Sequence, residues 1–218
     1  YDNSLGTVYD ATEQLEQEQS VEIFFCALNM IQKLMDCPDV AIYRVNKEKY
    51  ARLFAYSSAK AASMGSTVYL PGKKPLDEAC NENRAYINRS MEKEYPMMAY
   101  NVESEEQMEI LIMLWSIPFE RMTINEANRL IVIGKLIQTS VRRADRYLEA
   151  LSEERYHSES QILKASAFEE LVGAYRKASK GKLTEYVLLQ IEVEGKNEKE
   201  TVDKCTLLLR ESDYIGNL

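Results

Sequence analysis

The chain has 218 residues, a length that corresponds to one large domain or two small ones. Hydrophobic residues make up 45% of it, with only 8 Gly and 5 Pro, so the composition excludes a disordered, collagenous or low-complexity chain. With 27 Lys and Arg against 35 Asp and Glu, the formal net charge of −8 excludes a general basic surface for nucleic acid polymers. We therefore expect no DNA or RNA partner, and any nucleotide ligand must bind at a local site.

The apolar runs and the cysteines limit the remaining classes. The longest apolar run, residues 110–115, has the length of a strand and is too short to cross a membrane. Four scattered cysteines without C-x-x-C spacing, together with a single histidine, do not make a zinc set. The sequence predicts reduced thiols in a cytoplasmic compartment, and neither a metal nor a cofactor.

The first 124 residues have the pattern of an α+β sandwich around one sheet. Apolar residues at helical spacing predict a helix that begins at Ser20 and ends before the turn at residues 37–39. A second helix is predicted from Pro75 to Arg84, with proline in its first turn. The predicted strands are 40–45, 51–57, 67–70, 85–89 and 109–117.

From residue 125 to 156 the pattern is helical and free of proline. Its apolar residues recur in steps of four and three: Leu130, Gly134, Ile137, Val141, Ala144, Leu148 and Leu151. Such a helix would be over ~45 Å long, more than a compact domain of this size needs. Two interpretations stay open and can hold along different stretches: a helix at 125–157 that connects two domains and forms a homodimer, or one that covers its own sheet.

Residues 158–218 are predicted to form a second small domain. Helices are expected at 162–177 and 198–209, with a strand at 186–193 between them. About 60 residues is small for an independent core. We therefore expect this domain to lack its C-terminal part.

The most specific motif is R-x-x-D, formed by Arg210 and Asp213 in the last ten residues. This segment resembles the end of the first half of a GGDEF domain, where R-x-x-D precedes the GGDEF turn by five residues and is the inhibitory site for cyclic di-GMP. The resemblance implies that Arg210, Asp213, Glu211 and Ser212 bind this ligand. The chemistry suits them, since a guanidinium grips guanine or phosphate with two hydrogen bonds and a carboxylate accepts from guanine N–H groups.

The same comparison implies that the chain is not an enzyme. Diguanylate cyclases carry Asp-x-Asp at the end of the first strand, whereas here Glu192 and Glu194 stand near that place. Only 18 positions separate Glu192 from Arg210, about half the interval of an active cyclase. Two glutamates could still hold Mg²⁺, but a solvent-facing acidic edge is the simpler interpretation. We expect a degenerate GGDEF domain without catalytic residues.

The N-terminal unit is similar to a GAF domain in the order of its elements. A GAF domain, a long helix and a degenerate GGDEF domain resemble the cyclic di-GMP receptors of Pel-type exopolysaccharide secretion in bacteria. The fold class is then two α/β sandwich domains joined by a long helix: 1–124, 125–157 and 158–218. The resemblance implies the cytoplasmic part of a membrane-anchored receptor that regulates an exopolysaccharide synthase complex and biofilm formation.

The alternative is a dimeric GAF-type sensory or docking scaffold whose nucleotide site is a relic. Its pocket would be lined by Tyr43, Tyr56, Tyr69, Tyr86, Met113 and Trp115, although such residues in strands are more often core. The receptor interpretation lacks one residue, because cyclic di-GMP has two phosphates and two guanines and needs a second arginine. The candidates near the connecting helix are Arg143, Arg146 and Arg155.

Overall fold

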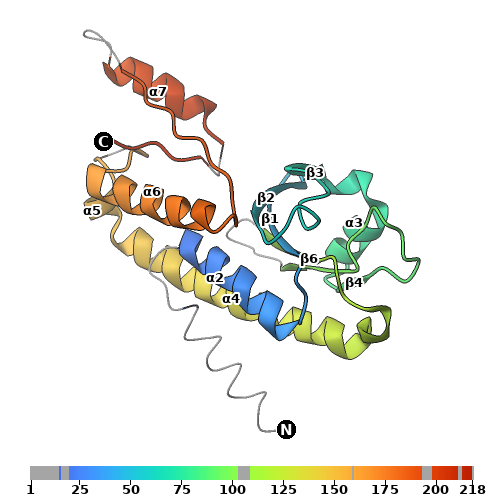
Figure 1. Cartoon of the computed structure of the whole chain (residues 1–218). Helices are drawn as coiled ribbons and strands as arrows, with labels where there is room; N and C mark the ends of the chain where they lie inside the picture. The colour runs from blue at the N-terminus through green and yellow to red at the C-terminus, as the bar shows by residue number, and fades with distance from the viewer. Residues whose placement is uncertain are drawn as a thin grey trace.

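The computed structural model of the chain describes residues 15, 20–102, 109–158, 160–192, 198–210 and 213–217. One six-stranded antiparallel sheet forms its centre, with the strand order β3-β2-β1-β6-β5-β4 (Figure 1). The strands are β1 (Val40–Val45), β2 (Tyr50–Tyr56), β3 (Thr67–Tyr69), β4 (Tyr86–Ile87), β5 (Met98–Val102) and β6 (Glu109–Leu114). The α+β sandwich predicted for the N-terminal part is therefore confirmed.

Six α-helices and two short 3-10 turns surround or follow this sheet in the described part of the chain. The α-helices are α2 (Ser20–Leu34), α3 (Lys74–Asn81), α4 (Ile124–Ala150), α5 (Ser152–Arg155), α6 (Ala165–Lys180) and α7 (Glu198–Leu208). Two short 3-10 turns, Leu70–Gly72 and Phe119–Arg121, lead into α3 and α4. No described helix combines the length and the apolar character that a membrane crossing needs.

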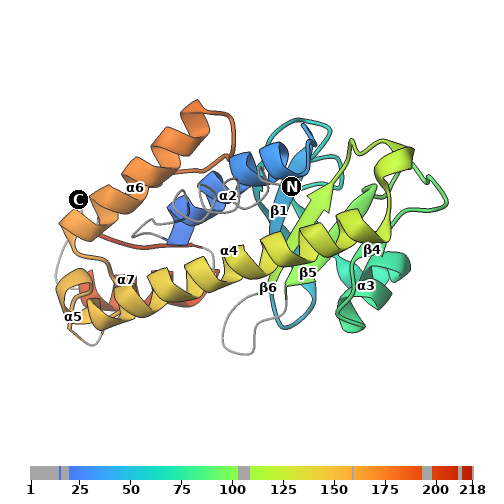
Figure 2. The same ribbon diagram turned by 90° about the horizontal axis from the view of Figure 1, so that it is seen from below.

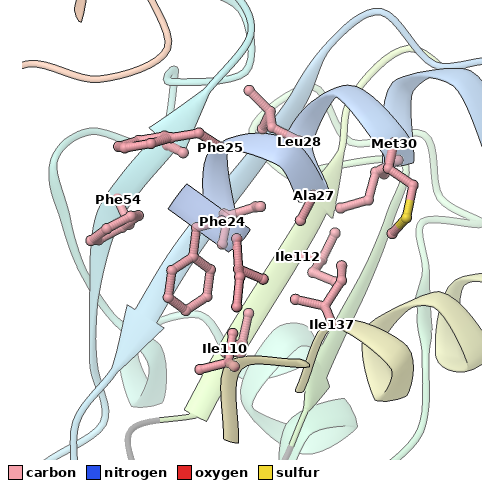
Figure 3. Close-up of a cluster of buried hydrophobic side chains, with 14 of the residues drawn as sticks. Phe24, Phe25, Ala27, Leu28, Met30, Phe54, Ile110, Ile112 and Ile137 are labelled. Carbon is pink, nitrogen blue, oxygen red and sulfur yellow. The ribbon is translucent and has the colours of Figure 1, made fainter. Parts of the chain in front are cut away.

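One face of the sheet is covered by α2 and α4, and α6 packs on α2, so that the three helices share a single apolar core. Figure 2 shows α2 lying between α4 and α6, and α2 packs against both. The core joins Phe24 and Leu28 of α2 to Ile112 of β6, Ile137 of α4 and Phe168 of α6 (part of it in Figure 3). Because α6 buries its apolar face against α2, residues expected in the second unit share the core of the first.

The opposite face of the sheet is covered by α3. Odd-numbered residues of β1 and β6, such as Tyr43 and Met113, point toward this face, while their even-numbered neighbours join the core with α2. Leu76 and Cys80 of α3 complete this second cluster. The alternation explains why β1 and β6 are buried on both faces and carry almost continuous apolar residues.

The long helix covers its own sheet. Leu130, Gly134, Ile137, Val141 and Ala144 are buried against α2 and the sheet, so the heptad spacing is satisfied within the chain over this stretch. Gly134 allows a close approach, because a Cβ there would lie 2.8 Å from a methyl of Val102. The second interpretation of the helix is thus confirmed for residues 130–144, while the homodimer stays a prediction.

The predicted strands differ from the structure at two places: one strand was missed and one predicted strand is not formed. The strand β5 escaped the sequence analysis, because a polar stretch precedes it and Asn101 interrupts its apolar residues. Residues 186–192 of the predicted strand 186–193 have no regular secondary structure and no ladder partner, and residue 193 lies outside the described residues. A strand is defined by pairing, and this run finds no neighbour among the described residues.

The described part of 158–218 therefore shows helices and isolated bridges rather than a second sheet. Helices were predicted at 162–177 and 198–209, and α6 and α7 confirm both. The bridges join Leu163 to Tyr156 and to Gly216. The second sandwich and the three domain boundaries, 1–124, 125–157 and 158–218, stay predictions.

Candidate functional site

The R-x-x-D motif lies on a turn that follows α7. The backbone N–H of Asp213 donates to the carbonyl of Arg210 at 2.9 Å, and the N–H of Arg210 donates to Oδ2 of Asp213 at 3.1 Å. Both residues are exposed. Glu211 and Ser212, the other two predicted ligand residues, lie outside the described residues. The turn therefore holds Arg210 and Asp213 together in solvent.

Residues 213–217, which begin with Asp213 of the motif, form what we call the C-terminal strap, which runs along α6. The N–H of Leu163 donates to the carbonyl of Ile215 at 2.9 Å, and the N–H of Asn217 donates to the carbonyl of Leu163 at 3.1 Å. The side chain of Asn217 also meets Nε2 of His157 at 3.1 Å. The only histidine of the sequence thus contacts the end of the strap.

The aromatic side chain of Tyr175 connects the strap to the sheet. Its ring lies 6.1 Å from that of Phe25 and 6.3 Å from that of Phe54, measured between centroids. Burial raises the pKa of Tyr175, the nearby Tyr214 raises it further, Arg44 lowers it and Asp213 raises it. Tyr175 of α6 therefore has Arg44 of β1 and Asp213 of the strap in its electrostatic neighbourhood.

Sequence reasoning missed Arg44 in this neighbourhood. The guanidinium of Arg44 lies over Phe24 and Phe54, 5.9 and 5.7 Å from the ring centroids. Figure 3 shows these two rings approaching each other from α2 and β2. No sequence signal could have found this grouping, because Arg44 and Tyr175 are brought to the same ring, Phe54, only by the packing of α6 on α2.

The arginines proposed to complete the ligand site lie elsewhere. Arg155 of α5 forms an ion pair with Glu170 of α6 at 3.1 Å. Arg143 and Arg146 lie on the exposed side of α4.

The acidic residues considered for catalysis are not gathered into a site. Glu192 is exposed and accepts a 3.4 Å hydrogen bond from the side chain of Gln190, while Glu194 lies outside the described residues. Across the described residues, no three His, Cys, Asp or Glu side chains are grouped as metal ligands. The absence of catalysis stays a prediction.

The pocket residues named for the N-terminal unit fall into two groups. Tyr43, Tyr86, Met113 and Trp115 are buried on the face of the sheet toward α3, whereas Tyr69 is exposed and Tyr56 partly so. Burial raises the pKa of Tyr43 to about 12 and, together with Glu92 and Tyr95, that of Tyr86 to about 12. The core interpretation therefore fits the buried group.

One polar atom in that group has no partner. The indole N–H of Trp115 is buried and makes no hydrogen bond to the described residues. The cluster that contains Trp115 also includes the small residues Ala41, Ala61, Ala79 and Ala99. A buried N–H without an acceptor is destabilising, so this atom marks the position where an acceptor would be favoured.

The similarity of this chain to known proteins is limited to solved structures. No protein-family model matches the chain, and no curated protein matches it. Among solved structures, a methyl-accepting chemotaxis protein (residues 122 to 287) is similar at a TM-score of 0.49 and 6% identity, covering 62% of this chain and 96% of that chain. The GAF domain of a proposed sensor histidine kinase from Pseudomonas syringae pv. tomato has a TM-score of 0.47 and 13% identity, covering 69% and 92%.

A bacteriophytochrome from the photosynthetic bacterium R. palustris is similar over a longer stretch. Its TM-score is 0.46 at 8% identity, and the match covers 97% of this chain but 55% of that chain. Similarity of this size carries no argument about the function of this chain.

Proposed function

We propose that the chain is a non-catalytic receptor for cyclic di-GMP, which binds through Arg210 and Asp213. One observation carries the proposal: a single turn presents both side chains to solvent, with hydrogen bonds of 2.9 and 3.1 Å between the two residues. No carboxylate among the described residues forms an ion pair with Arg210. A ligand would therefore meet this guanidinium without displacing a described ion pair.

The two side chains match the two parts of a guanine nucleotide. The planar guanidinium of Arg210 can donate two parallel hydrogen bonds to guanine O6 and N7 or to a phosphate. The Asp213 carboxylate uses Oδ2 for the backbone of Arg210, which leaves Oδ1 to accept from the N1–H and N2–H₂ groups of guanine. Binding by these residues needs no metal, and the proposal contains no catalytic step.

The regulatory output follows from the strap. Asp213 is the first residue of the C-terminal strap, which packs on α6, and α6 shares a core with α2 and the sheet. Ligand binding at the turn would therefore bias the position of the strap on α6. By the resemblance noted for the sequence, the partner is an exopolysaccharide synthase complex at a bacterial membrane.

Calorimetric titration of cyclic di-GMP into the chain tests this proposal. We expect saturable binding, at least tenfold weaker in Arg210→Ala, because one bidentate interaction is lost. Lys204→Ala is the matched control: Lys204 lies on exposed α7, pairs with Glu200 at 2.8 Å, and should leave affinity unchanged. Affinity retained in Arg210→Ala would exclude this site.

A second candidate function, a GAF-type sensory scaffold, is favoured by the unpartnered N–H of Trp115. Trp115 is the only tryptophan of the sequence, so its fluorescence reports on the face of the sheet toward α3. Titration with cyclic AMP, cyclic GMP and cyclic di-GMP should change this emission if the face binds a ligand. No change with any of them, together with binding that depends on Arg210, would leave the first proposal alone.

Both candidate functions include the homodimer that the sequence predicts through the long helix. Val132 and Tyr147, 55% and 50% exposed, lie on the side of α4 that the chain itself leaves uncovered. Sedimentation equilibrium of the chain and of Val132→Glu tests the dimer. We expect the wild type to dimerise and the variant to sediment as a monomer.

A further inference from the structure

Two arginines face each other across the first hairpin of the sheet. In the register of β1 and β2, Arg44 is directly opposite Arg52. Both point toward the face that carries α2, because Arg44 lies over Phe24 and Arg52 stands two positions before Phe54 on the same strand. Both are half-buried. Side chains directly opposite in an antiparallel pair have Cβ atoms about 5 Å apart, where like charges repel.

This pair of positive charges has no ion-pair partner in the described part of the chain. Neither guanidinium forms an ion pair or a side-chain hydrogen bond with a described residue. The contacts of Arg44 are the rings of Phe24 and Phe54, which attract a cation but leave its charge uncompensated. Two adjacent positive charges without an ion-paired carboxylate favour an external anion between them.

An exposed aromatic pair lies next to the arginines. Tyr50 of β2 is in register with Tyr69 of β3, with ring centroids 4.9 Å apart and planes inclined by 37°. The two residues are 42% and 50% exposed. Tyr50 precedes Arg52 by two positions and shares its face of the sheet, about 7 Å along the strand.

We propose that Arg44 and Arg52 bind the phosphate of a nucleotide whose base stacks on Tyr50 and Tyr69. Two guanidinium groups can each donate two hydrogen bonds to one phosphate, and the anion removes their repulsion. Every base has a π-face that stacks on an exposed tyrosine, so the site selects a phosphate joined to an aromatic base. The overall charge of −8 makes this a local site rather than part of a basic surface. It uses neither Arg210 nor Asp213 and is independent of the function proposed above.

Thermal unfolding in low-salt buffer with AMP or inorganic phosphate tests the site. For the wild type we expect the Tm to rise with AMP, and to rise less with the same concentration of phosphate. In Arg52→Gln we expect AMP affinity to fall at least tenfold. Without ligand, the Tm of this variant should equal or exceed that of the wild type, because one repelling charge is gone.

Three further variants separate the parts of the proposal. Tyr69→Ala should weaken the response to AMP and leave the response to phosphate, since it removes only the stacking surface. Arg89→Gln, at an exposed arginine on the loop after β4, and Arg210→Ala should respond as the wild type does. The proposal is overturned if AMP leaves the wild-type Tm unchanged, if Arg52→Gln keeps the response, or if phosphate alone matches AMP. Because Arg210→Ala is included, the cyclic di-GMP proposal can fail without affecting this one.

Discussion

Gly216 of the C-terminal strap lies against the ring of Phe168 on α6. A Cβ at Gly216 would come within 2.6 Å of both Cβ and Cδ2 of Phe168. Phe168 is 8% exposed and belongs to the core that α6 shares with α2, so it has little room to move. Any larger residue at 216 must therefore push the strap away from α6.

Gly216→Ala should release the strap. The two hydrogen bonds that hold it, from Leu163 N–H to Ile215 and from Asn217 N–H to Leu163, would then open more often. We expect faster amide hydrogen exchange at Leu163 and Asn217, while amides in the sheet exchange as in the wild type. Unchanged protection at Leu163 would contradict the close packing of Gly216 on Phe168.

Gly134→Ala should destabilise the chain even though alanine favours helices. The added Cβ would meet Val102 at 2.8 Å and the ring of Tyr100 at 3.0 Å, and such overpacking costs about 1–3 kcal/mol. Gly173→Ala is the matched control, since no atom lies within 4 Å of its Cβ, and it should stabilise by about 0.5–1 kcal/mol. Equilibrium urea unfolding of both variants measures the change in the free energy of unfolding, which should have opposite signs in the two.

Asp39 links the ends of β1, β2 and β6 and should make stability depend on acid pH. Its carboxylate accepts hydrogen bonds from Ser58, at 2.6 Å, and from Ser116, and Lys60 lies 3.8 Å away. Burial alone would raise the pKa of Asp39, but the two serine hydroxyls and Lys60 lower it below its ordinary value.

A lowered pKa in the folded state stabilises the fold above the pKa of the unfolded chain, and this contribution disappears as pH falls through the folded pKa. Asp39→Asn should therefore reduce the free energy of unfolding by about 1–3 kcal/mol at pH 7. Below about pH 4 the difference between variant and wild type should shrink. A difference of the same size at pH 7 and pH 3 would contradict this role.

Thr184 fastens the segment after α6 to the edge of the sheet. Its hydroxyl donates to the carbonyl of Phe54 at 2.8 Å and is buried, and the N–H of Tyr56 donates to Leu183 at 2.8 Å. Thr184→Val removes the donor at nearly constant volume and should cost about 1–2 kcal/mol. Thr139→Val, at an exposed position of α4, should change stability by less than about 0.5 kcal/mol. Equal effects of the two substitutions in chemical unfolding would contradict this role of Thr184.

Local pattern predicted most elements of the N-terminal part. The apolar spacing of α2 and the apolar run of β6 are properties of the residues themselves, and both lie where they were expected. The strand β5 was missed, because five residues containing Asn101 become a strand only between β6 and β4. Residues 186–192 were predicted as a strand and are not one, because these strand-forming residues have no described strand to pair with.

The candidate sites also differ in whether local spacing or the tertiary structure defines them. Arg210 and Asp213 were predicted because their spacing is local, and the structure places them on one turn. The pair Arg44 and Arg52 was missed, because the register of a hairpin decides which side chains oppose each other. A shift of one residue would have sent Arg52 to the other face of the sheet.

The sequence by itself determined the helices, most of the strands, the sandwich class of the N-terminal part and the motif at Arg210, because each depends on residues close together in the chain. Only the tertiary structure decided that α6 shares a core with α2 and that residues 130–144 of the long helix bury their heptad positions against α2 and the sheet. Apolar periodicity states that a face must be buried but not against what, since hydrophobic burial has no direction. The partner of each face is chosen by the packing of the whole chain.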